Sequence, residues 1–147
     1  MIRVLFVCHG NICRSPMAEF MLKNRLLKEK INNVSVDSAA TSTEELGNDM
    51  YAPAKRKLKE EGIPFERRSA RQIRKSDYQN YDMLIGMDAY NVKNMIRYFG
   101  DDPDKKISML LDRPVADPWY TGDFDATYKD INEGLDILIE KIQSQLY

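Results

Sequence analysis

The sequence is poor in the residues that build metal centres and disulfide scaffolds. Its 147 residues include one histidine, His9, and two cysteines, Cys8 and Cys13, which stand five positions apart. Two thiols so close in one segment would make a poor structural disulfide. They fit a reducing compartment, in which a thiol stays reduced. His9 lacks the companion ligands that a metal site needs. We therefore expect a cytoplasmic protein in which His9 binds no metal, and we expect no cofactor.

Long apolar runs and an excess of charge of one sign are also absent. No window approaches the roughly 18 uninterrupted apolar residues of a membrane-spanning helix, and the first residues lack the pattern of a signal peptide. The formal net charge is −1, so we expect no nucleic-acid and no membrane partner. A chain that is 43% hydrophobic can bury a core, and we expect a single domain over residues 1–147 that is a monomer.

The sequence does contain a thiol and a guanidinium separated by five residues. Cys8 follows an apolar run from Val4 to Val7, and Arg14 precedes a helix-like run that starts near Pro16. A loop between a strand and a helix N-terminus turns its backbone N–H groups inward and forms a cradle for an anion. We expect the Cys8 thiol to ionise easily there, and the thiolate is the nucleophile. Because Arg14 fits two oxygens of a tetrahedral oxyanion, the loop indicates attack of sulfur on phosphorus.

Short apolar runs alternate with helix-like segments along the chain. Strands are expected over residues 2–7, 34–38, 81–87 and 107–111. Helices are expected over residues 16 to about 31, 52–62, 91–99 and 123–145, with a loop and short helix over 67–76. Asp88 is the expected N-cap of the helix over 91–99. This order predicts an α/β fold of three layers, α/β/α, around a four-stranded parallel sheet, with the anion-binding loop between the first strand and the first helix. Ligands bind such sheets at the carboxyl ends of the strands, where Cys8 stands.

A carboxyl group later in the chain fits the role of proton donor. Asp117 lies between the fourth strand and the final helix, and Pro118, Trp119 and Tyr120 follow it. Proline favours an extended backbone at Asp117. Aromatic surface and a neighbouring anion both favour a protonated carboxyl, the form that a general acid requires. Asp-Pro alone is most often a turn, so this assignment rests on its place in the fold and on the two aromatic residues.

Five segments together resemble the low-molecular-weight protein tyrosine phosphatases, from the first strand to the last helix. They occur in the family's order and approximate spacing. They are Val-Cys-His-Gly-Asn-Ile-Cys-Arg-Ser-Pro at 7–16, Asp-Ser-Ala-Ala-Thr at 37–41, Ala-Arg-Gln at 70–72, Met-Asp at 87–88 and Asp-Pro-Trp-Tyr at 117–120. A bare Cys-x5-Arg pattern is weak evidence, whereas five segments in register make the resemblance specific.

The resemblance implies hydrolysis of phosphotyrosine through a phosphocysteine intermediate. Cys8 would be the nucleophile, Arg14 would bind the transition state, and Asp117 would be the general acid and base. The implied phosphate-binding loop residues are His9, Gly10, Asn11, Ile12, Cys13 and Ser15. The implied supporting and clamping residues are Ser38 and Asp88 for the loop and for Arg14, and Trp119 and Tyr120 for the substrate ring. By the same resemblance, Ser15 donates its hydroxyl to the Cys8 thiolate, Asn11 and Ser38 hold the loop in its strained shape, and no metal is needed.

Several of these residues also have a simpler interpretation. Asn11 could merely tolerate a left-handed turn, and Ser38 could be a turn hydroxyl, although we favour loop support for both. Cys13 could be an inert buried thiol or, as the family implies, a partner that pairs with Cys8 under oxidants. His9 is most simply a solvated residue at the pocket mouth.

Two positions depart from the commonest pattern of the family. Arg68 stands where many members have a histidine, three residues before the arginine of Ala-Arg-Gln. Residues 41–47 contain no aromatic residue, whereas eukaryotic members often have tryptophan in this loop. We therefore expect a more polar pocket wall, with Glu44 and Glu45 nearby, and the peptide preference stays open.

Three other functions are alternatives. A thiol-dependent arsenate reductase of the same fold passes oxidation to later cysteines, and none follows Cys13. A phosphoarginine phosphatase typically has threonine where this loop has Ile12, whose side chain offers no hydroxyl to position water. A non-catalytic phosphotyrosine-binding module would have no use for Cys8 or Asp117. We therefore expect a protein tyrosine phosphatase whose partners are phosphotyrosine-containing proteins.

Overall fold

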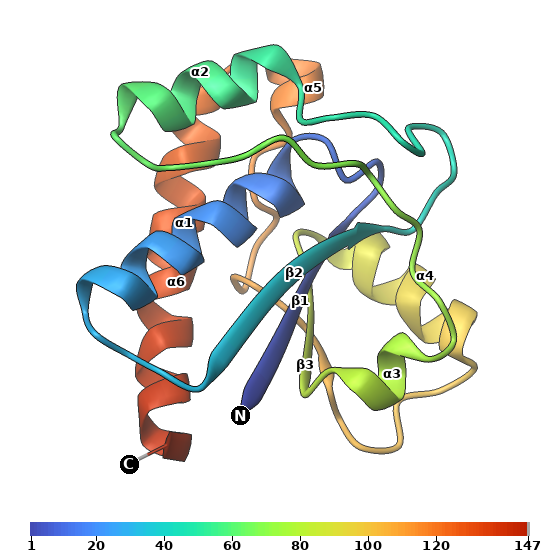
Figure 1. Ribbon diagram of the computed structural model, residues 1–147. Helices are drawn as coiled ribbons and strands as arrows, with labels where there is room; N and C mark the ends of the chain where they lie inside the picture. The colour runs from blue at the N-terminus through green and yellow to red at the C-terminus, as the bar shows by residue number, and fades with distance from the viewer. Residues whose placement is uncertain (147) are drawn as a thin grey trace.

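A parallel four-stranded sheet forms the middle of the molecule (Figure 1). The computed structural model describes residues 1–146. The strands are β1 (Ile2–Cys8), β2 (Val34–Ala40), β3 (Met83–Gly86) and β4 (Ile107–Met109). The helices are α1 (Arg14–Lys28), α2 (Ala52–Glu60), α3 (Asp77–Asn80), α4 (Ala89–Phe99), α5 (Pro118–Thr121) and α6 (Phe124–Leu146). The strand order is β2-β1-β3-β4, and every neighbouring pair is parallel.

Helices cover both faces of the sheet. Figure 1 shows α1, α2 and α6 on one side and α3 and α4 on the other. Successive side chains of β1 point to opposite faces, so Val4 and Phe6 join the core formed with α1, α2 and α6. Leu5 and Val7 join a smaller core on the side of α3 and α4. The predicted three-layer fold with its four-stranded parallel sheet is therefore confirmed.

The strands lie at the predicted positions, but their ends differ. β4 ends at Met109, two residues before the predicted end. Leu110 and Leu111 leave the sheet and bury their side chains in the larger core, so their apolar character serves packing against helices. β2 continues to Ala40, which pairs with Cys8 at the end of β1.

The sequence predicts a loop where the structure has the helix α5. The Asp117 side chain caps this helix by accepting the N–H of Trp119 at 3.1 Å. Pro118 occupies the first helical position, where its missing N–H costs nothing. Gly122 ends the helix in the left-handed conformation, with φ of +70°. Capping at both ends thus turns four residues of the expected loop into a helical turn.

The other helices begin or end within a few residues of their predicted limits. α1 begins at Arg14, two residues before Pro16. The short helix expected within 67–76 begins instead at Asp77, as α3. α6 begins and ends one residue later than predicted. Within residues 1–146, no helix combines the length and apolar character needed to cross a membrane.

The end of β1 lies where the strand order reverses. The chain places β2 on one side of β1 and then adds β3 on the other side. In open parallel sheets this reversal opens a crevice at the carboxyl ends of the strands. Cys8 is the last residue of β1 and Arg14 the first of α1, so the loop of residues 9–13 lies at that crevice, as predicted.

Candidate active site

The sulfur of Cys8 contacts two polar groups, one from the loop of residues 9–13 and one from α1. The backbone N–H of Asn11 donates to Cys8 Sγ, with 3.3 Å between the two heavy atoms. The hydroxyl of Ser15, in the first turn of α1, lies 3.0 Å from the same sulfur. Cys8 is only 4% exposed. These contacts suit a sulfur that carries negative charge.

Asn11 ties the loop to its surroundings. Its side chain is fully buried and its φ of +58° is left-handed, a conformation that asparagine tolerates. Its Nδ2 donates to Ser15 Oγ at 2.8 Å and to Ser38 Oγ at 2.9 Å. Ser38 in turn donates to Glu19 Oε1 at 2.6 Å. Asn11 therefore both turns the chain and connects the loop to β2 and α1.

Arg14 is buried and shared among several acceptors. Its Nη1 donates to Asp88 Oδ2 at 3.0 Å and to the backbone oxygen of Val115 at 3.1 Å. Its Nη2 lies 3.4 Å from Asp117 Oδ2. These partners come from the segments that follow β3 and β4, so one guanidinium joins the carboxyl ends of three parallel strands.

Asp88 holds Arg14 and a helix at the same time. Its Oδ1 accepts the N–H of Asn91 at 2.8 Å, and Asn91 Oδ1 accepts the N–H of Asp88 at 3.1 Å, which completes a capping box. The predicted N-cap is confirmed, although α4 begins at Ala89, two residues earlier than expected. Because α4 fixes the carboxylate, Asp88 presents its second oxygen to Arg14 in a set position.

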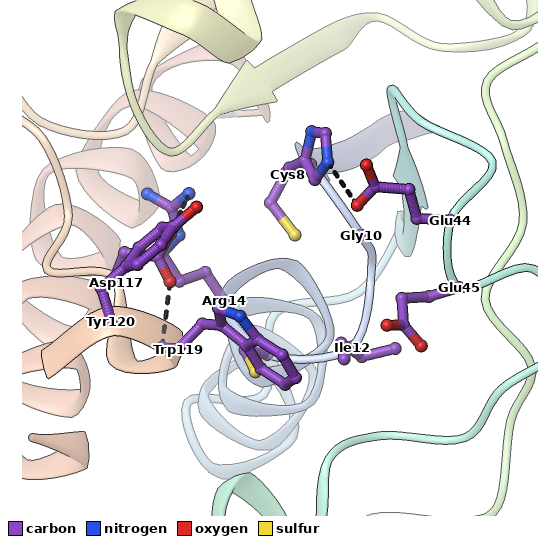
Figure 2. A pocket seen from close by; sticks show the side chains of 11 residues that line it. Cys8, Gly10, Ile12, Arg14, Glu44, Glu45, Asp117, Trp119 and Tyr120 are labelled. Carbon is purple, nitrogen blue, oxygen red and sulfur yellow. Dashed lines mark hydrogen bonds and ion pairs between the residues drawn. The ribbon is translucent and has the colours of Figure 1, made fainter. Parts of the chain in front are cut away.

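A pocket of about 240 Å³ opens above the loop, and its walls differ in chemistry (Figure 2). Its lining residues are Cys8, His9, Gly10, Ile12, Cys13, Arg14, Glu44, Glu45, Asp117, Trp119 and Tyr120. One wall is aromatic, because α5 carries Trp119 and Tyr120, which are 54% and 85% exposed. The Trp119 ring also packs against Tyr51, with 5.1 Å between ring centroids. Asp117 lies at the base of this wall, beside Arg14.

The opposite wall carries carboxylates. Glu44 lies 2.9 Å from His9 Nε2, and both side chains are largely exposed. Glu45 accepts a hydrogen bond from Asn48 Nδ2 at 2.7 Å. His9 therefore sits at the pocket mouth as expected, but it has an acidic partner that its position in the sequence did not reveal. The absence of an aromatic residue in 41–47 does leave this wall polar.

Comparison with known proteins identifies the family of this chain. Residues 3–146 match the family model of low molecular weight phosphotyrosine protein phosphatases. The chain belongs to this family. The low molecular weight protein-tyrosine-phosphatase YfkJ of Bacillus subtilis is 36% identical over 153 aligned residues, which cover 99% of this chain and 98% of YfkJ.

Solved structures of family members superpose closely on this phosphatase. The crystal structure of YfkJ gives a TM-score of 0.94 at 36% identity and covers 99% of this chain and 96% of its own. The low molecular weight protein tyrosine phosphatase of Streptococcus pyogenes gives 0.89 at 37% identity, with coverage of 96% and 93%. An arginine phosphatase of Drosophila gives 0.86 at 30% identity, with coverage of 96% and 98%. The resemblance expected from the sequence is confirmed, and the fold alone does not separate the two substrate classes.

The second cysteine of the phosphatase differs from the first in its chemical environment. Burial, followed by the neighbouring Cys8 and Asp117, raises the pKa of Cys13 to about 12, against the effect of Arg14. Cys13 is therefore a protonated thiol at neutral pH, which is a weak nucleophile. Both cysteines are free thiols in the structure.

Several residues around the site were not among the predicted functional residues. Glu19, Arg68 and Arg71 all bind the Asn11–Ser38 network, through Ser38 Oγ or Asn11 Oδ1, and Val115 binds Arg14 through its carbonyl. Arg68 was noted in the sequence only as a departure from a family pattern. Backbone carbonyls and distant charges give no local motif, so their roles emerge only from the fold.

Proposed function

We propose that this phosphatase hydrolyses phosphotyrosine monoesters through a phosphocysteine intermediate. The observation that carries the proposal is the convergence of three groups on one pocket. Cys8 Sγ lies in the pocket, in hydrogen-bond contact with the Asn11 N–H and the Ser15 hydroxyl. Arg14 and Asp117 line the same pocket, 3.4 Å from each other. A thiolate, a guanidinium and a carboxyl in one small cavity are the groups that transfer of a phosphoryl group to sulfur requires.

In the first step the Cys8 thiolate attacks phosphorus in line with the bond to the tyrosine oxygen. The S–P bond forms as the P–O bond breaks, and Asp117 gives its proton to the leaving oxygen. Arg14 and the amide groups of the loop hold the equatorial oxygens and match their charge in the transition state. The products of this step are free tyrosine hydroxyl and phosphocysteine.

In the second step water attacks the phosphocysteine. The Asp117 carboxylate takes a proton from that water, the new P–O bond forms, and the S–P bond breaks. The electron pair returns to Cys8 as thiolate, and inorganic phosphate leaves. Asp117 thus recovers the proton that it gave up, and the cycle needs no oxidant and no added cofactor.

The pocket walls favour phosphotyrosine over phosphoarginine. Trp119 and Tyr120 present flat aromatic surface beside Asp117, which suits an aryl ring. Ile12 lines the same pocket and has no hydroxyl that could position water against a P–N bond. The relatives named as tyrosine phosphatases support the same choice. The structural likeness to an arginine phosphatase makes phosphoarginine the second candidate.

Phosphotyrosine-containing proteins are the proposed substrates, and the cytoplasm is the proposed site of action. A reducing compartment keeps Cys8 and Cys13 as the free thiols that the reaction needs. We also propose that the protein works as a single-domain monomer without a nucleic-acid or membrane partner. Sedimentation of the purified protein at micromolar concentration tests the monomer, and a dimer would refute it.

Turnover assays test the proposed function directly. Wild type should hydrolyse para-nitrophenyl phosphate and phosphotyrosine, and Cys8→Ser should abolish turnover while phosphate still binds, because the loop amides and Arg14 remain. Phosphotyrosine and phosphoarginine peptides are compared side by side. Faster phosphoarginine turnover would overturn the substrate assignment, and no turnover at all would favour a non-catalytic phosphotyrosine-binding module.

A further inference from the structure

Arg68 reaches the site from outside the pocket. It lies in the segment between α2 and α3, and its Nη2 donates to Asn11 Oδ1 on the buried side of the loop. Its Nη1 lies 3.4 Å from the backbone oxygen of Asn48, and its own backbone N–H donates to Asp49 Oδ1 at 3.2 Å. Arg68 is thus held at its guanidinium and at its backbone N–H, and these three partners are not among the residues that line the pocket.

Arg68 and the backbone of Arg71 together fix which way the Asn11 amide faces. A guanidinium only donates hydrogen bonds, so the atom of Asn11 that faces it is the oxygen. The backbone N–H of Arg71 donates to the same oxygen at 3.3 Å. With its oxygen held by these donors, Asn11 turns both hydrogens of Nδ2 to Ser15 and Ser38.

This orientation sets the direction of the serine hydroxyls. Ser38 accepts from Asn11 and gives its only hydrogen to Glu19. Ser15 also accepts from Asn11, so its only hydrogen is free for Cys8 Sγ, 3.0 Å away. Hydrogen bonds therefore run in one direction, from Arg68 through Asn11 and Ser15 to the sulfur. A chain of this kind polarises along its length.

Charged side chains near this series of hydrogen bonds are mostly paired with one another. Glu19 pairs with Lys23 and Asp49 with Lys55. On the pocket side, Cys8 shares the cavity with the other titratable residues that line it, which are His9, Cys13, Arg14, Glu44, Glu45, Asp117 and Tyr120. Burial lowers the pKa of Arg68, whereas Glu19, Asp49 and Cys8 raise it, and a guanidinium stays charged at every pH at which the protein is active.

The geometry points to Arg68 as a positioning residue that holds Ser15 as a hydrogen-bond donor to Cys8 and so stabilises the thiolate without touching the substrate. The inference rests on the proposed function, because the thiolate is the proposed nucleophile. It predicts that loss of the Arg68 charge matters most at pH values below the midpoint of Cys8 labelling, where the protonated thiol prevails.

Labelling of Cys8 tests the inference without any turnover. Iodoacetamide carries no charge, so its rate reports thiolate and not attraction of an anion, and fragmentation mass spectrometry distinguishes Cys8 from Cys13. Arg68→Gln keeps a donor but removes the charge, and Arg68→Lys keeps the charge. We expect Arg68→Gln to move the pH midpoint of labelling upward by about one unit, with Arg68→Lys between it and wild type. The exposed neighbour Arg67 provides the control, and Arg67→Gln should match wild type.

The pH dependence of turnover separates positioning from general damage. For para-nitrophenyl phosphate we expect kcat/KM of Arg68→Gln to be about tenfold below wild type at pH values below both labelling midpoints and to approach wild type above them. An unchanged midpoint, or a loss that is equal at every pH, would overturn the inference. Thermal unfolding checks that each variant is folded. If Arg68→Gln folds poorly, the test rests on Arg68→Lys, whose labelling midpoint should lie above that of wild type. A shifted midpoint in a protein that hydrolyses no phosphotyrosine would refute the proposed function alone.

Discussion

A buried guanidinium with two carboxylate partners dominates the site at the scale of single residues. Arg14 contacts Asp88 at 3.0 Å and Asp117 at 3.4 Å. Asp88 is fixed by its helix cap, so its contact is a permanent support. Asp117 makes the longer contact and lies in the pocket, so in the proposed mechanism a phosphate oxygen would take its place on Arg14. That exchange would leave Asp117 beside the leaving oxygen.

The first prediction concerns this guanidinium. Arg14→Lys should lower kcat/KM for phosphotyrosine at least about 100-fold, because one ammonium cannot hold Asp88, Val115 and two phosphate oxygens together. Steady-state kinetics measure the loss, and circular dichroism checks the fold. Activity within a few-fold of wild type would remove Arg14 from the transition-state role. Arg67→Lys, on the exposed surface, serves as the matched control.

The second prediction concerns the proton donor. Asp117→Asn should slow substrates with poor leaving groups, such as phenyl phosphate, by about 100-fold or more, and para-nitrophenyl phosphate much less. Asparagine is as good an N-cap as aspartate, so the α5 turn should survive and the effect should be chemical. The measurement is kcat across a series of aryl phosphates. Equal slowing of all members would assign Asp117 to binding or to structure instead.

At the scale of elements, one carboxylate organises the turn between α4 and β4. Asp102 Oδ1 accepts the Tyr78 hydroxyl at 2.7 Å and the N–H of Lys106 at 2.8 Å, and its Oδ2 accepts the N–H of Ile107 at 3.1 Å. Burial favours a raised pKa for Asp102, but these hydrogen bonds outweigh it and hold the pKa below the ordinary value of 3.8. The turn therefore depends on the ionised form.

The third prediction follows from the sign of that shift. A carboxyl whose pKa is lower in the folded state stabilises the fold above its ordinary pKa, and the stabilisation is lost as pH falls through the folded value. Asp102→Asn should therefore lower the free energy of unfolding by about 1–2 kcal/mol at pH 7, and the difference from wild type should shrink below about pH 4. Urea unfolding from pH 7 to pH 3 measures it, with Asp104→Asn on the same turn as control. A difference that stays constant with pH would contradict the assignment.

The elements themselves were largely predictable, because β1 and β3 are short, mostly apolar runs that helix-like segments separate. Their ends were less so. Leu110 and Leu111 look like a continuation of β4, yet they pack against helices once the strand has ended. The α5 helix was missed because Asp-Pro usually signals a turn, and only the contact of Asp117 with Trp119 N–H and the left-handed Gly122 make it helical.

The site residues that stand in a sequence motif were predictable. Cys8, Arg14 and Asp117 stand in recognisable segments, and the fold brings them to one pocket. Arg68 and Val115 could not be placed from sequence, because their contacts with Asn11 and Arg14 span 57 and 101 residues. Such long-range hydrogen bonds depend on the path of the chain and leave no local signal.

At the scale of the whole molecule, the last helix completes the core that the first strand begins. Val4 and Phe6 of β1 share one buried cluster with Ile131 and Leu135 of α6, and Figure 1 shows α6 running beside α1 along the sheet. The helix comes especially close at Gly134, where an added Cβ would lie 2.9 Å from Leu110 Cδ1. Glycine therefore sets the distance between α6 and the end of β4.

The fourth prediction tests this close approach. Alanine at position 134 gains about 1 kcal/mol in helix propensity, but overpacking against the buried Leu110 costs about 1–3 kcal/mol. We expect Gly134→Ala to lower the free energy of unfolding by up to about 2 kcal/mol, measured by urea unfolding. Leu110→Ala alone should cost about 2–5 kcal/mol, and less in the Gly134→Ala background, because the added methyl fills part of the cavity. A stabilised Gly134→Ala variant, or strictly additive effects in the double mutant, would show that α6 can move away from the sheet without loss.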